Sequence, residues 1–166
     1  MVKPQHLLAA TGITAAAIIA FFIFFQSDTA KIKKCFSTLS AQAEKSGDEH
    51  DLAAAVTARK IESLFAETVR IEIPSYDIDQ TLPHSEISSH VLYARSQYRD
   101  ISLKFYDFQI EFPEEGAARV TLTGILKATT RAGERVEETH EAECELKKVE
   151  DTWLLTGVKG VDVLEK

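Results

Sequence analysis

The chain has 166 residues, 45% hydrophobic and 27% charged, which is enough for one domain with a real core and excludes a disordered polymer. Its net charge of -7 and the lack of a basic stripe in the expected folded part argue against nucleic acid as a partner. The sequence contains no zinc-type cysteine spacing, no glycine-rich phosphate loop and no nucleophile-elbow motif. It therefore predicts no metal, no nucleotide and no other cofactor.

The first predicted element is a membrane span, Leu7–Phe25, which contains no charged residue. At about 1.5 Å per residue it just crosses a hydrocarbon core of about 30 Å, and it is longer than the apolar region of a signal peptide. A cleavage site before residue 31 would place Asp28 where a small neutral residue is required. We expect an uncleaved anchor between a tail (residues 1–6) and a linker (residues 26–30), with a cleaved signal peptide as the alternative.

The orientation of this span is predicted from its layout, because its charges do not decide it. Lys3 precedes the span, and the lysines that follow it are offset by Asp28, so the positive-inside rule gives no clear answer. A short tail before a large domain is the usual layout of a signal anchor. We expect a single-pass cell-membrane protein whose domain, residues 31–166, lies on the extracytoplasmic (periplasmic) side.

Two helices follow the span in the expected fold. Apolar residues at helical spacing predict the first helix over residues 32–43, with Gly47 as its stop. Asp48 is the expected N-cap of the second helix, over about residues 50–67.

A short strand, a loop and a third helix come next. The alternation in TVRIEIP predicts a strand over residues 68–74, closed by its proline, and residues 75–83 are expected to be a loop. A Ser or Thr cap signal then opens a helix over about residues 84–100. Its apolar stripe consists of Ile87, Val91, Ala94 and Tyr98.

Everything after residue 100 is predicted to be strand. The apolar positions of ISLKFYDFQIEF change parity in the middle, which is typical of a β-bulge, here at Tyr106 and Asp107. Three further strands are expected over residues 118–130, 136–146 and 152–166. Because the strands cluster instead of alternating with helices, the fold class is α+β.

The strand VEETHEAECEL holds the most interesting candidate pair, Glu138 and His140. Both fall on the otherwise apolar face of the strand, about 7 Å apart, so one ligand could touch both, and the carboxylate would raise the basicity of the histidine. Either the pair lines a pocket, or the strand runs past the core there. Burying either group without a partner would cost on the order of 1–3 kcal/mol, so each should have a partner or open water.

Three further side chains are candidates for a site. Asp107 is a candidate general base because bulges re-aim side chains. Tyr93 and Tyr98, on the third helix, are candidate ligand contacts, although packing on the sheet with their hydroxyls at a cavity mouth is the simpler expectation.

The two cysteines, Cys35 and Cys144, both fall on apolar faces and are expected to be buried free thiols. A single bridge between them stays open as an alternative in an oxidising compartment.

This order of elements resembles the nuclear transport factor 2-like superfamily, which has the cystatin-like cone fold. The resemblance covers about residues 31–163 and is carried by the two N-terminal helices, TVRIEI before SEISSHVLYARSQY, the bulged LKFYDFQIEF, and the closing ELKKVEDTWLLTGV. It implies three helices packed on a strongly curved antiparallel sheet around a cone-shaped cavity. Members include ketosteroid isomerase and dehydratases as well as binding and assembly domains.

Two hypotheses of function follow from the resemblance, because a fold does not settle function. The isomerase-like members use an Asp base and a Tyr-plus-acid oxyanion hole, which this sequence does not match residue by residue. We therefore expect a non-catalytic, membrane-anchored domain that binds a small apolar ligand in its cavity, or a protein partner or second copy through its sheet face. The alternative is an isomerase- or dehydratase-type enzyme with His140 or Asp107 as its base.

Overall fold

The computed structural model describes residues 27–74 and 77–161. The expected span Leu7–Phe25 lies outside these residues, and within them no helix is both long and apolar enough to cross a membrane. The chain divides into two compact units, Met1–Lys34 and Cys35–Lys166, and the fold below is that of the second unit.

The second unit contains the helical residues 35–43, two further helices and six strands. In chain order the later elements are α2 (Asp51–Glu62), β1 (Phe65–Ile73), β2 (Ile78–Pro83), α3 (His84–Gln97), β3 (Tyr98–Glu114), β4 (Ala117–Thr130), β5 (Arg135–Val149) and β6 (Thr152–Val161). This arrangement confirms the α+β class, since the four long strands follow one another after the last helix.

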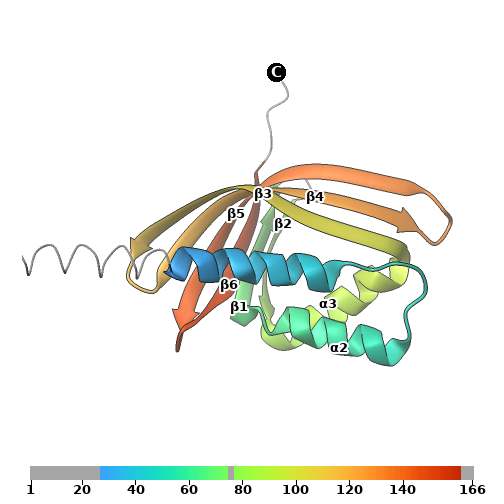
Figure 1. Cartoon of the computed structure of the whole chain (residues 1–166), viewed down its shortest axis with the longest axis horizontal. Helices are drawn as coiled ribbons and strands as arrows, with labels where there is room; N and C mark the ends of the chain where they lie inside the picture. The colour runs from blue at the N-terminus through green and yellow to red at the C-terminus, as the bar shows by residue number, and fades with distance from the viewer. Residues whose placement is uncertain (1–26, 75–76, 162–166) are drawn as a thin grey trace, which may run out of the picture. The chain divides into compact units, whose positions relative to one another are not determined.

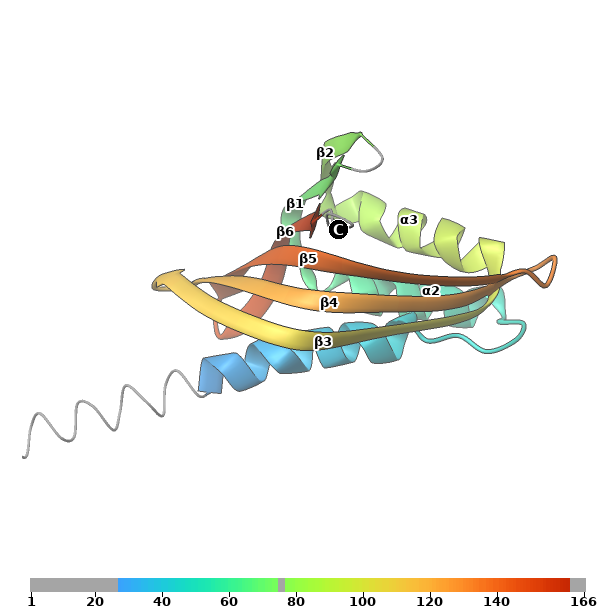
Figure 2. The same cartoon turned by 90° about the horizontal axis from the view of Figure 1, so that it is seen from above.

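The six strands form one sheet in the order β2-β1-β6-β5-β4-β3, which Figure 2 shows from one side. The strands β3 to β6 are joined as antiparallel neighbours, as predicted. However, β1 pairs with β6 in parallel, so the prediction of an antiparallel sheet throughout is wrong at this one junction. β1 and β6 are the first and last strands in the sequence, so no hairpin turn joins them, and β6 runs beside β1 in the same direction.

The core of the unit lies between the helices and one face of this curved sheet. In Figure 1, α2 and α3 lie on the same side of the sheet. The inner face includes the buried side chains of Val120, Leu122, Cys144 and Leu146, so the apolar face of VEETHEAECEL points inward at Cys144 and Leu146. Alternate residues point to opposite faces of a strand, so Glu145 lies on the outer face and is exposed.

The predicted bulge in β3 is confirmed. The register between β3 and β4 shifts between Tyr106 and Gln109, and Asp107 has a φ of 56°, in the left-handed region. Because the extra residue changes the parity of the strand, Phe105 and Phe108 both face inward. Each packs edge-on against Phe36, with ring centroids 5.4 and 5.5 Å away.

Several element boundaries differ from the predicted ones. The second helix begins at Asp51 with His50 as its N-cap, so Asp48 does not cap it, and Phe65 belongs to β1. The third helix has Pro83 as its N-cap with no side-chain cap bond, and it ends at Gln97.

The expected loop over residues 75–83 contains the strand β2, which pairs with β1 over Thr68–Ile73. This strand was missed because Leu82 is its one buried residue, so its sequence has almost no apolar alternation.

Candidate functional site

An apolar cavity of about 350 Å³ lies between the helices and the inner face of the sheet. Its apolar walls include Leu39, Ile61, Val69, Ile87, Ile101 and Leu103, which come from the first two helices, β1, α3 and β3. A volume of this size and an apolar lining are typical of sites for small molecules.

The polar side chains that line this cavity are His90 and Arg95, both on α3. His90 and Ala94 are exposed to solvent, so the cavity opens beside this helix. The part of the wall that could supply polar chemistry is therefore confined to one helix.

Arg95 is buried, and its guanidinium has acceptors for all of its N–H groups. Glu49 accepts two hydrogen bonds, from Nε at 2.9 Å and from Nη2 at 2.8 Å. The main-chain carbonyls of Gln42, Ala43 and Glu44 accept the others, at 3.1, 3.0 and 3.4 Å. These carbonyls end the helix over residues 27–43, so Arg95 also satisfies groups that a helix C-terminus leaves without intrahelical partners.

Lys45 is also buried, and its side chain satisfies carbonyls at the end of α3. Its Nζ donates to the carbonyls of Arg95 and Tyr98, both at 2.7 Å, at the C-terminal end of the helix. The main chain of Lys45 pairs with Ile101 through two hydrogen bonds of 2.9 Å. The first helix and α3 are thus tied end to end by two basic side chains.

Asp100 holds the neighbouring turn in place. Its carboxylate accepts from the backbone N–H of Gly47 at 3.0 Å and from Nε of Arg99 at 2.9 Å. These hydrogen bonds, that of Gly47 first, lower the pKa of Asp100. Gly47 has a φ of 73°, a conformation that glycine adopts without strain.

Glu138 and His140 lie on the inner face of β5 but outside the cavity lining. The Nε2 atom of His140 is 3.3 Å from Oε2 of Glu138, and their side chains are 55% and 43% exposed. Their cross-strand partners are Leu126 and Gly124 of β4. Glu138 and His140 therefore each have a polar partner, the other residue of the pair, and access to water.

Asp107 lies at the bulge of β3, where its carboxylate accepts a hydrogen bond from the Thr123 hydroxyl at 3.1 Å in an exposed position. Tyr93 is 69% exposed on α3, while Tyr98 is half-buried at the start of β3. None of these residues lines the apolar cavity, and the structure does not bring Asp107 and His140 into it.

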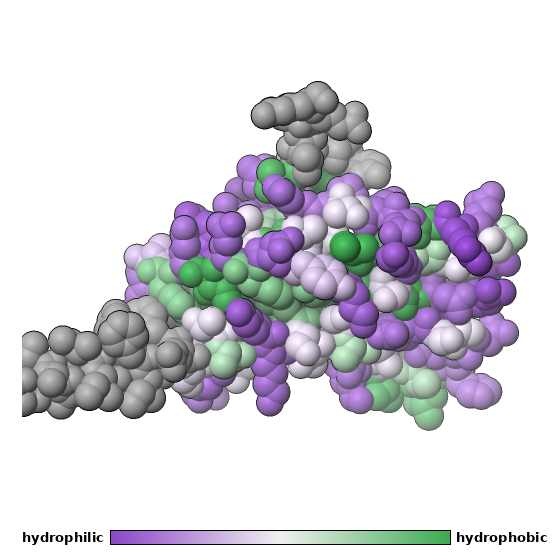
Figure 3. Space-filling view, turned by 45° about the horizontal axis from the view of Figure 1, so that its top comes forward, coloured by the Kyte–Doolittle hydropathy of each residue, from purple (hydrophilic) through white to green (hydrophobic). Residues whose placement is uncertain are grey.

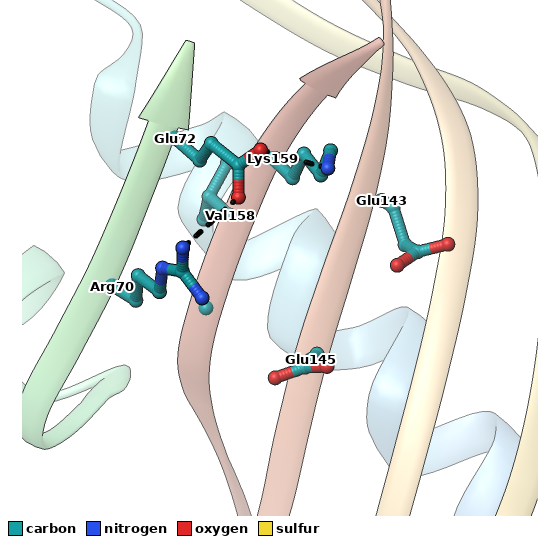
Figure 4. Close-up of a pocket in the computed structure, with 7 residues that line it drawn as sticks. Arg70, Glu72, Glu143, Glu145, Val158 and Lys159 are labelled. Atoms are coloured by element: carbon teal, nitrogen blue, oxygen red, sulfur yellow. Dashed lines mark ion pairs between the residues drawn. The ribbon is translucent and has the colours of Figure 1, made fainter. Parts of the chain in front are cut away.

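A second, smaller pocket of about 80 Å³ lies on the outer face of the sheet (Figure 4). Arg70 of β1 and Lys159 of β6 both pair with Glu72, at 3.5 and 2.7 Å, and Arg70 also forms a two-point pair with Asp79 of β2. Hydrogen bonding to Arg70 lowers the pKa of Asp79. Glu145 of β5 completes this exposed, charged surface.

The cysteines are free and buried in the described structure, as expected. Burial raises the pKa of Cys35 to about 11 and, together with the nearby Cys35 and Glu143, that of Cys144 to about 12. Thiols of this kind are poor nucleophiles and poor metal ligands at neutral pH. Among the residues that the structure describes, no group of three or more His, Cys, Asp or Glu side chains could hold a metal ion.

The basic residues that shape the site were not predicted from the sequence. These residues are Arg95 and Lys45. The residues they contact are about 50 positions away along the chain, so no local spacing could reveal them.

No family model and no curated protein matches this sequence, but solved structures do. The Kfla4162 protein from Kribbella flavida matches with a TM-score of 0.68 and 13% identity, over 82% of this chain and 90% of that chain. A candidate scytalone dehydratase from Novosphingobium aromaticivorans matches with a TM-score of 0.62 and 12% identity, over 86% of each chain.

The hexachlorocyclohexane dehydrochlorinase LinA-type3 from Novosphingobium barchaimii matches with a TM-score of 0.61 and 10% identity, over 82% of this chain and 86% of that chain. At these identities the likeness shows the fold alone, and that fold is the nuclear transport factor 2-like cone.

Proposed function

We propose that this domain binds a small, largely apolar ligand in the cavity between its helices and its sheet. The observation that carries the proposal is the cavity itself, about 350 Å³ in volume and apolar except for His90 and Arg95. A ligand that fills it would gain free energy from burying apolar surface, at about 25 cal/mol per Å². The LinA-type3 neighbour is named for its action on hexachlorocyclohexane, a small apolar molecule, which supports this choice of ligand class.

The placement of the candidate bases favours binding over catalysis. A general base must lie within hydrogen-bond reach of the proton that it removes. His140 and Asp107 lie outside the cavity lining, each in an exposed position with its own partner. Of the polar side chains in the described lining, Arg95 has only N–H donors and accepts no proton, and His90 lies at the exposed mouth.

The outer face of the sheet is a weaker candidate for function. An assembly surface is expected to have an apolar centre. Around β1, β5 and β6 this face instead carries exposed ion pairs. In the oblique view of Figure 3, hydrophilic residues predominate, with smaller hydrophobic areas between them. These features support ligand binding in the cavity over a protein partner or homodimer through the sheet.

We also propose that Leu7–Phe25 anchors the chain in the cell membrane, with the domain on the extracytoplasmic side. The charge-free length of this segment supports the anchor. The ligand would then be taken up outside the cytoplasm, next to the bilayer.

Isoleucine methyl NMR of the full-length protein in phospholipid nanodiscs tests ligand binding directly. On titration with 2-naphthamide, a neutral bicyclic amide, we expect saturable shifts of the methyl groups of Ile61, Ile87 and Ile101, which line the cavity. The methyl group of Ile125, on β4 and outside the cavity lining, should not move.

A pair of variants on α3 supplies the control. Ala94→Phe places a ring in the mouth of the cavity and should weaken binding at least tenfold. Ser89→Phe places the same ring at an exposed position of the same helix and should leave binding unchanged. Equal affinity in the two variants, or no saturable shift of the cavity methyl groups, would rule the proposal out.

A further inference from the structure

We infer that the cavity selects an uncharged ligand and rejects anions, because Arg95, the arginine in its described lining, has every N–H donor already engaged. This inference rests on the proposed function and adds the charge class of the ligand to it. An arginine in an apolar cavity would ordinarily suggest recognition of a carboxylate or phosphate. The hydrogen bonds of Arg95 argue against this role.

A guanidinium has five N–H donors, and each one on Arg95 has an acceptor. Two go to the carboxylate of Glu49 and three to main-chain carbonyls at the end of the first helix. The Arg95 and Glu49 side chains are 6% and 18% exposed, so the pair is kept away from solvent. An incoming anion would therefore find no free donor and would have to displace Glu49.

The charge of Arg95 is balanced as well as its donors. Glu49 supplies one full negative charge at 2.8 Å, and the carbonyl ends of a helix add the negative end of its dipole. Glu49 lines a separate cleft between α2 and α3, and Arg95 lines both that cleft and the cavity. The guanidinium thus lies between the two spaces with its charge paired to Glu49 and its donors occupied.

His90 is the remaining polar group, and it lies at the exposed mouth. A neutral ligand can place its apolar body among the cavity side chains and a hydroxyl, amide or carbonyl near His90 and water. A carboxylate at the buried end would lose its hydration without gaining a partner, which is strongly unfavourable. The ligand class that fits is a neutral, mainly apolar molecule with at most one polar end.

The experiment compares two ligands of nearly the same shape, 2-naphthamide and 2-naphthoate, with the full-length protein in nanodiscs at pH 7. Binding is followed through the methyl groups of Ile61, Ile87 and Ile101. We expect the amide to bind at least tenfold more tightly than the carboxylate. A carboxylate that binds as tightly as the amide, or more tightly, would overturn the inference while leaving ligand binding itself intact.

Two variants identify the cause of the preference. Glu49→Ala removes both carboxylate acceptors from Arg95, so two donors become free and the preference for the amide should fall at least threefold. Glu44→Ala also removes one negative charge nearby, but its carboxylate contacts Lys104 on the surface, and its carbonyl stays in place. This control should keep the preference of the unmodified protein.

An unchanged preference in Glu49→Ala, with the methyl spectrum showing a folded domain, would overturn the role given to Arg95. If Glu49→Ala does not fold, Glu49→Gln keeps one oxygen acceptor and should show a smaller change in the same direction. Failure of both ligands to shift the cavity methyl groups would instead count against the proposed function, so the two failures can be told apart.

Discussion

Glu138 and His140 are polar residues on a strand face that is otherwise apolar from Val136 to Leu146, and their access to solvent explains why they are tolerated there. On the same face, Cys144 and Leu146 are 3% and 2% exposed, whereas the His140 side chain is 55% exposed. The inner face of β5 therefore passes from core to solvent within a few residues. An exposed ion pair of this kind contributes little to stability.

We predict that His140→Ala changes the free energy of unfolding by no more than about 0.5 kcal/mol and leaves ligand binding unchanged. Leu146→Ala, on the same face of the same strand, should cost about 2–5 kcal/mol because it opens a cavity in the core. Urea unfolding of the full-length protein in a mild detergent, followed by fluorescence of the buried Trp153, measures both. A loss of ligand binding in His140→Ala without loss of stability would revive the enzyme hypothesis.

The two cysteines should be almost inert in the folded protein at pH 8. With a pKa of about 11 for Cys35 and about 12 for Cys144, at most about one thiol in a thousand is ionised there. We expect alkylation by iodoacetamide to be at least about a hundredfold slower in the native protein than in urea, where the thiol pKa returns to about 8.5.

The same raised pKa values set the direction of a pH effect. Each thiol stays protonated in the folded state and ionises in the unfolded state above about pH 8.5, so stability should fall as the pH rises from there towards 11.

Intact mass after alkylation in urea without reductant tests the alternative of a bridge between the two cysteines. Two labels per chain indicate free thiols, whereas none would indicate a bridge between Cys35 and Cys144.

At the scale of elements, the ends of two helices are joined by reciprocal contacts. Lys45, just after the first helix, donates to carbonyls at the end of α3, and Arg95, near the end of α3, donates to carbonyls at the end of the first helix. A cation at a helix C-terminus is favourable, and more so when it is buried and hydrogen-bonded. These contacts hold one end of the cavity, because Ala43, Arg95 and Ile101 line it there.

We predict that Lys45→Met destabilises the protein by about 1–3 kcal/mol, because it removes the donor from the carbonyls of Arg95, which is buried, and Tyr98, which is part-buried. The matched control is Lys104→Met, since the ion pair of Lys104 with Glu44 is exposed and should contribute less than about 1 kcal/mol. Thermal unfolding of the full-length protein in detergent compares them. Equal losses in the two variants would show that Lys45 does not act as described.

The elements with strong apolar periodicity were predictable from the sequence, and those without it were not. The β3 bulge was predicted because the parity of its apolar residues changes at Asp107. By contrast, β2 has a single buried residue, Leu82, and is held by its ladder to β1, which no pattern within the segment encodes. The site follows the same rule, since the cavity side chains come from apolar stripes, whereas the pairing of Arg95 with Glu49 depends on contacts between distant segments.

At the scale of the whole molecule, the proposed arrangement is a ligand-binding domain tethered to the membrane by Leu7–Phe25. The fold of residues 35–161 supplies the cavity, and the described residues contain no helix that could serve as the tether. The two proposals are therefore independent, and each can fail without the other.

We predict that the full-length protein stays in the membrane fraction after carbonate extraction and that its intact mass includes the N-terminal segment. Release as a soluble protein that starts near Lys31 would favour the cleaved signal peptide.

For the orientation of the domain, a C-terminal alkaline phosphatase fusion expressed in bacteria should be active, because this enzyme folds only outside the cytoplasm. An inactive phosphatase together with a fluorescent C-terminal reporter would reverse the orientation.

The contacts between Arg95 and the first helix determine which substitutions this sequence can accept during evolution. Three of its acceptors are main-chain oxygens, of Gln42, Ala43 and Glu44, and a main-chain oxygen is present whatever side chain occupies the position. Mutations at these positions that keep the helix should therefore leave the contact intact. Glu49 contributes its side chain, so a change there should persist only with a compensating change at position 95, and the two positions should covary among descendants of this sequence.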